Sequence, residues 1–521
     1  MTSIPGPGRR AVASLWAAVA VPYVVLALCV PAARALGVVG RVPIPALTVL
    51  GMLAGPALVI ARPGLAARLP EELDRWLGRD NRTLAALWAS GAVLALYALG
   101  RLAVFLADPT RIDCSIDPSN TFLVRHSCLT AYVHGAILSM DPAANVYDLA
   151  FVETAAGTAA ALPPTAAHFA PFTLDAFGYP PPFLLLPRAL WLLTVSFASQ
   201  RLLFAAASLL LFLFACASAA GTLGGAAERR MWLLTPLFAS NMVVLVTLQA
   251  GNFHLASVAL CLLCWVALER RRDGLAGSLL ALATLAKIFP GLLGVMLLAR
   301  RRWRAVGWTC VAAAAICALS VAVLGTKVWR DFVLYHLPNV QSGVALRFMV
   351  GTPREIALNA APFGIPFKLG ALGLAGWGWA EARQFGNVFS VLLVVLAILA
   401  ARNHGSAQHR LTVWLALVLL ASLRSPYAAP FVLSAMTVLL LVLAAEVQSP
   451  RGVAVFVAVW ALFSLPTPPS SPAVEIAVSL ARAGALYVFL VWAVLRKDPT
   501  AGGREARAPG AVALMPPAPS C

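Results

Sequence analysis

Long apolar runs recur from one end of this chain to the other, and they restrict it to a membrane fold. The first run is AVASLWAAVAVPYVVLALCV (11–30), and runs of roughly 16–24 residues follow it, about the length that an α-helix needs to cross a bilayer. Of the 521 residues, 61% are hydrophobic and 12% are charged, whereas a soluble chain carries about twice that share of charge. A transmembrane β-barrel would show short alternating segments instead. The sequence therefore predicts an all-α polytopic membrane protein.

The formal net charge of +18 has a topological explanation. Only four of the 39 basic residues are lysines, and many of the arginines stand in clusters at the ends of apolar segments. The positive-inside rule places such clusters on the cytoplasmic side of a membrane protein. We therefore expect the lipid bilayer, and no nucleic acid, to be the partner that explains the charge.

The placement of arginines divides the chain into four predicted regions. Residues 1–83 are expected to form a transmembrane helix pair followed by an amphipathic cytoplasmic segment. Residues 84–445 would form the catalytic membrane core, and 446–496 the C-terminal transmembrane helices. Residues 497–521, rich in Ala, Pro and Gly, are expected to be a disordered cytoplasmic tail. The predicted total is about twelve crossings plus one half-crossing hairpin.

The hairpin is predicted at LATLAKIFPGLLG (282–294), which places Lys287 inside an apolar segment and three positions before Pro290. Basic clusters flank this segment on both sides, ERRRD before it and ARRRWR after it. A single crossing would put the second cluster outside and invert every later one. Two half-helices that enter and return keep both clusters in the cytoplasm. Lys287 is then expected at the outward turn, at the depth of lipid phosphates.

Polar chemistry gathers in two long loops, 108–180 and 325–385, which are predicted to be extracytoplasmic. Carboxylates dominate the first loop and cations the second. A carboxylate can take the proton of an acceptor hydroxyl, and Lys or Arg can stabilise the charge on a departing phosphate. The candidates are Asp113 and Asp117 as general bases, and Lys287, Arg347 and Arg354 as donor phosphate-binding cations.

Cysteine and histidine spacing adds two expectations for the first outer loop. Cys114 and Cys128 both lie in the predicted oxidising compartment, which makes them candidates for a disulfide. His126 and His134 are eight positions apart, whereas metal ligands on a helix prefer a separation of three or four. We therefore expect no metal site and no cofactor.

Five motifs occur in a fixed order within residues 108–435: NVYD, YPPPFLLLPRAL, LQAGNFH, GLAGSLLALATLAKIFPGLLGVMLLARRRWRA and SLRSPYAAPF. Each is weak alone, but their order and spacing together are specific. In this respect the chain resembles glycosyltransferase family 87, the polyprenol-phosphate-mannose-dependent mannosyltransferase-like membrane proteins of the GT-C fold class. The resemblance implies a GT-C-like fold and an inverting, metal-independent transfer of a sugar, often mannose, from a polyprenyl phosphate.

The resemblance also implies site residues. In that family an Asp of the first outer loop is the general base, commonly in an Asp-x-x-x-Tyr setting. The corresponding stretch here, NTFLVRHSCLTAY (120–132), contains no Asp, so the base is left open between Asp117, Asp113 and His126. By matching motif, the donor- or acceptor-site residues are Tyr147, Asp148, Tyr179, Asn252, His254 and Lys287.

Together these patterns predict a multi-pass glycosyltransferase of the cell (plasma or inner) membrane whose active site faces the extracytoplasmic side. Its expected partners are a polyprenyl-phosphate sugar donor and a glycan or glycolipid acceptor. The alternative is a transporter or flippase, but such proteins place polar groups near the midplane of many helices, often within inverted repeats. A third interpretation, which the missing Asp motif keeps open, is a family member without catalytic activity.

Overall fold

The structure is a computed structural model, and it describes residues 82–116, 118, 121–149, 163–402, 405–444, 459, 462–463 and 471–498. Every regular element in these ranges is a helix, and the described residues contain no strand. The predicted N-terminal helix pair lies outside the described residues, as do nearly all of the C-terminal tail and most of residues 446–470.

Four described helices are long and apolar enough to cross a membrane. They are α9 (Phe197–Leu223), α15 (Trp303–Leu324), α20 (Trp379–Ala401) and α24 (Pro472–Leu495). A fifth candidate is a bent pair, α11 (Met242–Ala250) and α12 (His254–Glu269), whose axes meet at 117°. The described part of the chain therefore supplies four or five candidate spans of a multi-pass membrane protein, and the count of about twelve stays a prediction.

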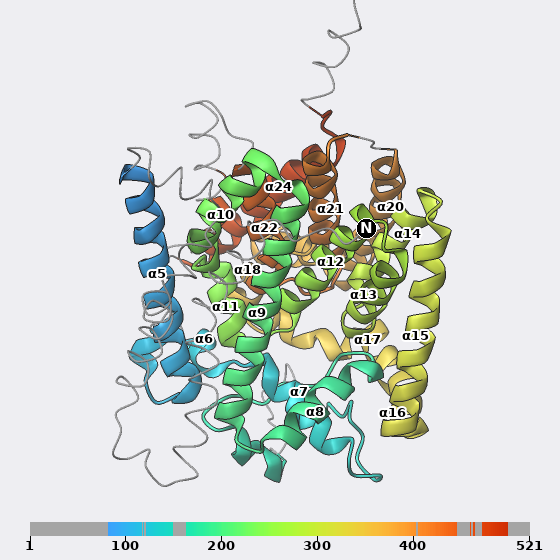
Figure 1. Cartoon of the computed structure of the whole chain (residues 1–521). Coiled ribbons are helices and arrows are strands. Elements are labelled where there is room, and N and C mark those ends of the chain that lie inside the picture. The colour runs from blue at the N-terminus through green and yellow to red at the C-terminus, as the bar shows by residue number, and fades with distance from the viewer. Residues whose placement is uncertain are drawn as a thin grey trace, which may run out of the picture.

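Other elements complete the bundle, and Figure 1 shows α7, α8 and α16 towards one end of it. The remaining helices are α5 (Arg82–Ala107), α6 (Thr121–Arg125), α7 (Cys128–Leu138), α8 (Leu185–Leu193), α10 (Gly225–Ala239), α13 (Asp273–Ala286), α14 (Leu292–Ala299), α16 (Thr326–Asp331), α17 (Leu337–Ser342), α18 (Pro353–Leu358), α19 (Ile365–Ala371), α21 (Ala407–Ser422) and α22 (Ser434–Ala444). Short 3-10 turns are η1 (Ile112–Cys114), η2 (Pro164–Phe169), η3 (Pro181–Leu184), η4 (Phe289–Gly291), η6 (Val344–Val350), η7 (Pro362–Gly364) and η8 (Pro430–Leu433), and η5 (Phe332–His336) is a π-helix.

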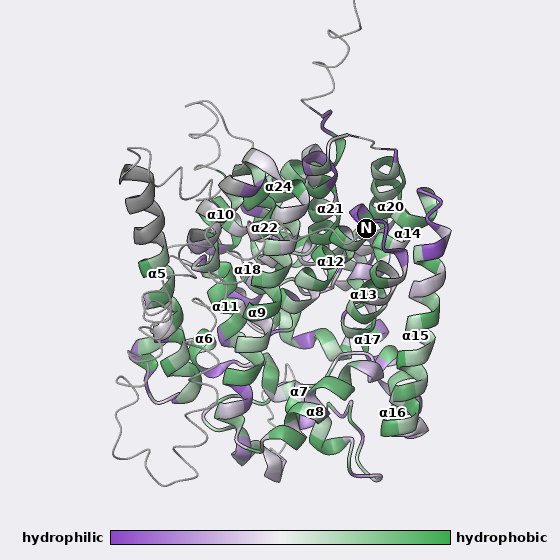
Figure 2. Ribbon diagram, in the orientation of Figure 1, coloured by the Kyte–Doolittle hydropathy of each residue, from purple (hydrophilic) through white to green (hydrophobic). Residues whose placement is uncertain are grey.

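The core of the bundle is formed by α12, α21 and α22, which are apolar on all sides and almost wholly buried. Trp265 of α12 and Trp414 of α21 are among the largest fully buried side chains. The indole N–H of Trp414 donates to the carbonyl of Cys261 over 2.9 Å, so this buried polar group has its partner inside the protein. Figure 2 shows the same distribution, with apolar residues along the helices and hydrophilic ones mainly near their ends.

One end of the bundle is held together by the basic clusters, and we call it the basic end. Arg410 makes a bidentate ion pair with Glu269, at 2.8 and 2.6 Å. Arg300 donates to the carbonyls of Ala400 and Ala401, which are the last of α20. Clusters that lie far apart in the sequence thus meet on one side, as the positive-inside rule requires of cytoplasmic segments.

The segment around Lys287 leaves the basic end and returns to it. Its first residue, Asp273, lies 3.7 Å from Arg302, the residue just before α15. In between, α13 ends at Lys287, η4 turns the chain at Pro290, and α14 leads back. Since α13 is 14 residues long, Lys287 is about 20 Å from the basic end. The two basic flanks therefore lie side by side and Lys287 lies at the turn.

Small residues allow α13 to pack closely on α15, and they fix this path of the chain. A Cβ added to Gly277 would lie 2.4 Å from the carbonyl oxygen of Ala305 and 2.7 Å from the amide nitrogen of Thr309. Gly294 of α14, by contrast, has no atom within 4 Å of the corresponding position. A methyl group at Gly277 would therefore clash with the backbone of α15, whereas one at Gly294 would meet no other atom.

We predict that Gly277→Ala destabilises the protein by about 1–3 kcal/mol, because the methyl group would push the backbones of α13 and α15 apart. Gly294→Ala is the matched control, and we expect it to be neutral or slightly stabilising since Ala is the better helix former. The measurement is the melting temperature of the two detergent-purified variants. Equal melting temperatures would contradict the close α13–α15 contact.

Reporter fusions test the hairpin in the membrane. We predict that reporters fused after residues 273 and 304 report the same, cytoplasmic side, because Asp273 and Arg302 are in contact. A phosphatase that is active only outside and a fluorescent protein that folds only inside give the two opposite readouts. Reporters on opposite sides would refute the hairpin.

Candidate active site

Lys287 is the centre of a polar cluster at the turn of the hairpin. Its ammonium nitrogen donates to Oδ1 of Asn252 over 2.9 Å. The same nitrogen lies 5.4 Å from the ring centre of Tyr179 and 5.9 Å from that of Phe431, within the range of cation–π contacts. The lysine is half-buried and its neighbour Ile288 is 67% exposed. The charge is thus held by protein groups while the turn stays open beside it.

Asn252 is placed by the break between α11 and α12. Gly251 adopts the left-handed conformation, with φ +63°, and a Cβ there would lie 3.0 Å from the Cβ of Leu129. Glycine therefore meets both the dihedral requirement and the close approach of α7. Oδ1 of Asn252 also accepts from the backbone N–H of His254 over 2.9 Å, and the His254 ring stacks on Phe289 of the hairpin turn.

Three tyrosines connect the first outer loop to this cluster. The hydroxyls of Tyr132 and Tyr179 are hydrogen-bonded over 2.9 Å, and the hydroxyl of Tyr147 donates to the carbonyl of Tyr179 over 2.9 Å. The Tyr132 hydroxyl also accepts from the N–H of Phe253 over 3.3 Å. The prolines that follow Tyr179 form the turn η3, which contacts both α13 and α15. These bonds bring the NVYD, YPPP and GNF motifs together around Lys287.

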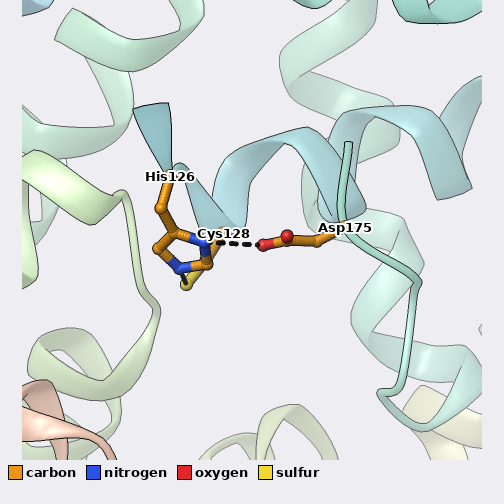
Figure 3. A group of neighbouring side chains, drawn as sticks. All are labelled: His126, Cys128 and Asp175. Atoms are coloured by element: carbon orange, nitrogen blue, oxygen red, sulfur yellow. Dashed lines mark hydrogen bonds and ion pairs between the residues drawn. The ribbon is translucent and has the colours of Figure 1, made fainter. Parts of the chain in front are cut away.

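Asp175, His126 and Cys128 form a second group of side chains (Figure 3). This group adjoins Asn252 through Cys128. Nδ1 of His126 lies 3.3 Å from Oδ2 of Asp175, and its other ring nitrogen, Nε2, lies 3.3 Å from the sulfur of Cys128. The sulfur in turn accepts from Nδ2 of Asn252 over 3.1 Å. The side chains of Asp175, His126, Cys128, Asn252 and Lys287 thus form one continuous chain of polar contacts.

The charge of His126 is set by its surroundings. Burial alone would lower its pKa, but the nearby carboxylate of Asp175 and the sulfur of Cys128 outweigh burial and hold the pKa well above the usual 6.5. The ring also stacks on Phe122, with 4.5 Å between the ring centres. His126 is therefore held as an imidazolium ion at neutral pH.

His126, Cys128 and Asp175 are also residue types that bind zinc, and their ligand atoms lie within 4.8 Å of one another. The orientation of the imidazole, however, gives one ring nitrogen to each neighbour. Binding of one ion by all three side chains would require a single ring nitrogen to face it together with the other two ligand atoms. The observed arrangement is that of a carboxylate, an imidazole and a thiol in sequence.

Of the two carboxylates predicted as bases, Asp113 lies within the described residues. The side chain of Asp113 is 64% exposed and pairs with Arg111 at 3.1 Å. The hydrogen bond from Arg111 lowers the pKa of Asp113 to about 2, which makes it a weak base. Asp117 lies outside the described residues. Of the two candidate bases that the structure describes, Asp113 and His126, His126 is the one that it connects to Lys287.

The predicted disulfide between Cys114 and Cys128 is not formed, and both residues are free thiols. Cys114 lies at the end of η1, where its sulfur contacts the carboxylate of Asp113. Cys128 begins α7 and faces His126 and Asn252. The helix α6 separates them, and each thiol has its own polar neighbours.

Two cations of the second loop are predicted to bind the donor phosphate. Arg347 and Arg354 are exposed, and within the described residues neither makes an ion pair. Arg347 lies on η6, which is joined to the SPYAAPF segment by an edge contact between Phe348 and Tyr427 at 5.2 Å, and Arg354 lies on α18. That segment also carries Phe431, which faces Lys287.

Tyr147 of the NVYD motif lies against the second loop. The ring of Tyr147 packs on His336, with 4.8 Å between the ring centres, and half-buried Asp148 follows it in the chain. Of the substrate-site candidates, Tyr147, Tyr179, Asn252 and His254 are therefore within one or two contacts of Lys287.

Sequence reasoning missed three members of the cluster: Tyr132, Cys128 and Asp175. The sequence indicates Cys128 only as a disulfide partner, and it does not distinguish Asp175 from the other carboxylates of the first loop. The spacing of Cys128 and Tyr132, one helical turn apart at the start of α7, is a signal that places both on the same helix face. No sequence pattern links Asp175 to His126, because the contact depends on the path of the intervening loop.

The fold and the cluster define a helical membrane protein with a polar, cation-containing site at the turn of a broken hairpin. Residues 177–426 match the model of glycosyltransferase family 87, a membrane family of the GT-C class, so this part of the chain is a glycosyltransferase family 87 domain. The domain contains Tyr179, Asn252 and Lys287. His126, Cys128 and Asp175 precede it in the sequence. No curated protein and no solved structure gives a match to the chain.

We predict that Asp175→Asn removes a pH-dependent part of the stability. Because the folded pKa of His126 is raised, its ion pair with Asp175 stabilises the protein fully below about pH 6.5, the unfolded value, and this contribution is lost as the pH rises through the folded value. The wild type should therefore exceed the variant in melting temperature by a few degrees at pH 6, with the difference shrinking towards pH 9.

Asp113→Asn is the control, since the lowered pKa of Asp113 affects stability only as the pH falls towards about 2. Melting curves of the three proteins in one detergent between pH 6 and 9 provide the measurement. A difference between the wild type and Asp175→Asn that stays constant over this range would contradict the ion pair.

Proposed function

We propose that this protein is a membrane glycosyltransferase that moves a sugar, mannose in the first instance, from a polyprenyl phosphate to a hydroxyl of an extracytoplasmic glycan or glycolipid acceptor. The observation that carries the proposal is the position of Lys287. A lysine at the turn of an apolar hairpin, bonded to a side-chain amide and flanked by two aromatic rings, is a cation preplaced for an anion. A family 87 domain supplies the reaction class.

The lipid-linked donor fits the surroundings of Lys287. A polyprenyl phosphate brings an apolar chain and an anionic headgroup, and the turn offers an exposed apolar side chain, Ile288, directly after the cation. As the bond between sugar and phosphate breaks, negative charge grows on the phosphate, and the ammonium group of Lys287 stabilises it. Arg347 of η6 and Arg354 of α18 are exposed and would hold the same headgroup from the water side.

The acceptor hydroxyl must lose its proton during attack on the anomeric carbon. We assign this task to the group formed by Asp175, His126 and Cys128, because it is joined to Lys287 through Asn252. Attack from the face opposite the phosphate inverts the configuration and uses no metal. Tyr147, Asp148, Tyr179 and His254 would shape the sugar and acceptor sites between these two groups.

In the membrane, the basic end would lie in the cytoplasm and the Lys287 turn would face the extracytoplasmic leaflet of the cell membrane. The contact between Asp273 and Arg302 supports a half-crossing hairpin within a chain of about twelve crossings. A transporter would instead distribute polar groups along a path through the midplane of several helices. Here the described contacts concentrate around one turn, which favours an enzyme.

Sugar transfer from radiolabelled polyprenyl-phosphate mannose, in membranes with and without the protein, is the direct test. We expect Lys287→Met to lower the transfer rate by about 10²–10³-fold, as the loss of one preorganised charge at a reacting phosphate does, and Lys287→Arg to retain part of it. Arg304→Met is the control, since it removes an exposed cation at the basic end. Transfer by Lys287→Met at the wild-type rate would contradict the assignment of Lys287. Absence of transfer by the wild type from any polyprenyl-phosphate sugar offered would contradict the function.

A further inference from the structure

The side-chain amide of Asn252 has only one orientation that fits its neighbours. Its oxygen faces two donors, the ammonium group of Lys287 and the backbone N–H of His254, both at 2.9 Å. The NH₂ group must then point the other way, at the sulfur of Cys128, 3.1 Å away. The sulfur of Cys128 therefore accepts a hydrogen bond from Asn252.

Because His126 is held as an imidazolium ion, its Nε2–H provides a second donor to the same sulfur. Nδ1 faces the carboxylate of Asp175, so that nitrogen carries a proton, and Nε2 faces Cys128 at 3.3 Å. Cys128 is also the first residue of α7, an 11-residue helix, and the N-terminus of a helix favours a negative charge. Two donors and a helix N-terminus thus converge on one sulfur atom.

We propose that the sulfur of Cys128 is a thiolate and is the catalytic base that takes the proton of the acceptor hydroxyl. The inference rests on the proposed function and names the atom that performs its proton transfer. Both nitrogens of His126 are engaged, one by Asp175 and one by Cys128, so His126 has no free lone pair to offer to a hydroxyl. Cys128 and Lys287 are hydrogen-bonded to opposite ends of the Asn252 side-chain amide. The base and the phosphate-binding cation are therefore separated by one side chain.

The step balances without a further reactant. The acceptor O–H proton passes to the thiolate, the acceptor oxygen forms a bond to the anomeric carbon, and the bond between that carbon and the phosphate oxygen breaks. The phosphate leaves with the electron pair next to Lys287, and the new thiol afterwards returns its proton to water. His126 stays an imidazolium ion throughout and acts as a positioning residue, held by Asp175.

Replacement of Cys128 tests the proposal, with polyprenyl-phosphate mannose as the donor. Cys128→Ala and Cys128→Ser should lose about 10²–10⁴ in transfer rate, whereas Cys128→Asp, which restores an ionised base at the same place, should retain at least ten times more activity than Cys128→Ala. Cys114→Ala is the matched control from the same loop and should transfer at the wild-type rate. Melting temperatures of all variants show whether each one is folded.

A double-mutant cycle separates a base from a merely structural thiol. In the wild-type background, His126→Asn should lower the rate by at least tenfold, because the thiolate loses its counter-ion. In the Cys128→Asp background the same change should cost less than threefold, since a carboxylate ionises without help. Equal losses in both backgrounds would overturn the proposal.

Three further results would also overturn it: wild-type activity in Cys128→Ala, no gain of folded Cys128→Asp over Cys128→Ala, or one equivalent of zinc in the purified wild type that Cys128→Ala lacks. A sugar covalently attached to Cys128 would show a nucleophile in place of a base. In each of these cases the wild type still transfers the sugar, so failure of this inference is distinct from failure of the proposed function.

Discussion

The hydrogen bond between the ammonium group of Lys287 and the side chain of Asn252 is the contact on which the site depends. A charge inside an apolar segment is costly unless protein groups compensate it, and here an amide oxygen and two aromatic rings do so. The same amide reaches Cys128 with its other end. One asparagine thereby joins three segments: the hairpin, the break between α11 and α12, and the start of α7.

The position of that asparagine follows from backbone constraints. Gly251 ends α11 in a left-handed conformation where no side chain would fit against Leu129, and α12 starts immediately afterwards. At the hairpin, Pro290 keeps α13 from continuing, and Gly277 lets α13 approach α15. Both helix breaks thus lie at the polar cluster. A break in a transmembrane helix leaves backbone and side-chain groups available for other contacts.

Much of this arrangement could be predicted from the sequence. Helical class and membrane location follow from the length of the apolar runs. The placement of arginines predicts that the ERRRD and ARRRWR flanks lie on one side of the membrane, and Asp273 of the first flank contacts Arg302 of the second. The family 87 resemblance is confirmed for residues 177–426. Three of the motifs contribute Tyr179, Asn252 and Lys287, and these residues converge on one point in the structure.

The rest depended on contacts that no local pattern encodes. Asp175 meets His126 across 49 positions that include helix α7, and Cys114 turns to Asp113 while Cys128 turns to Asn252, so that their common place in a predicted oxidising compartment wrongly suggested a disulfide. Asp113 looked like a free base, but Arg111, two residues before it, occupies its carboxylate. Side-chain pairing of this kind depends on loop geometry, which composition and spacing do not determine.

The central claim is that Lys287 binds the phosphate of a lipid-linked sugar donor. An electron cryo-microscopy structure of the protein with a bound polyprenyl phosphate tests it most directly. Our account predicts a phosphate oxygen about 3 Å from the ammonium nitrogen of Lys287, on the side away from Asn252. A phosphate bound at the basic end, or on the second loop out of reach of Lys287, would contradict it.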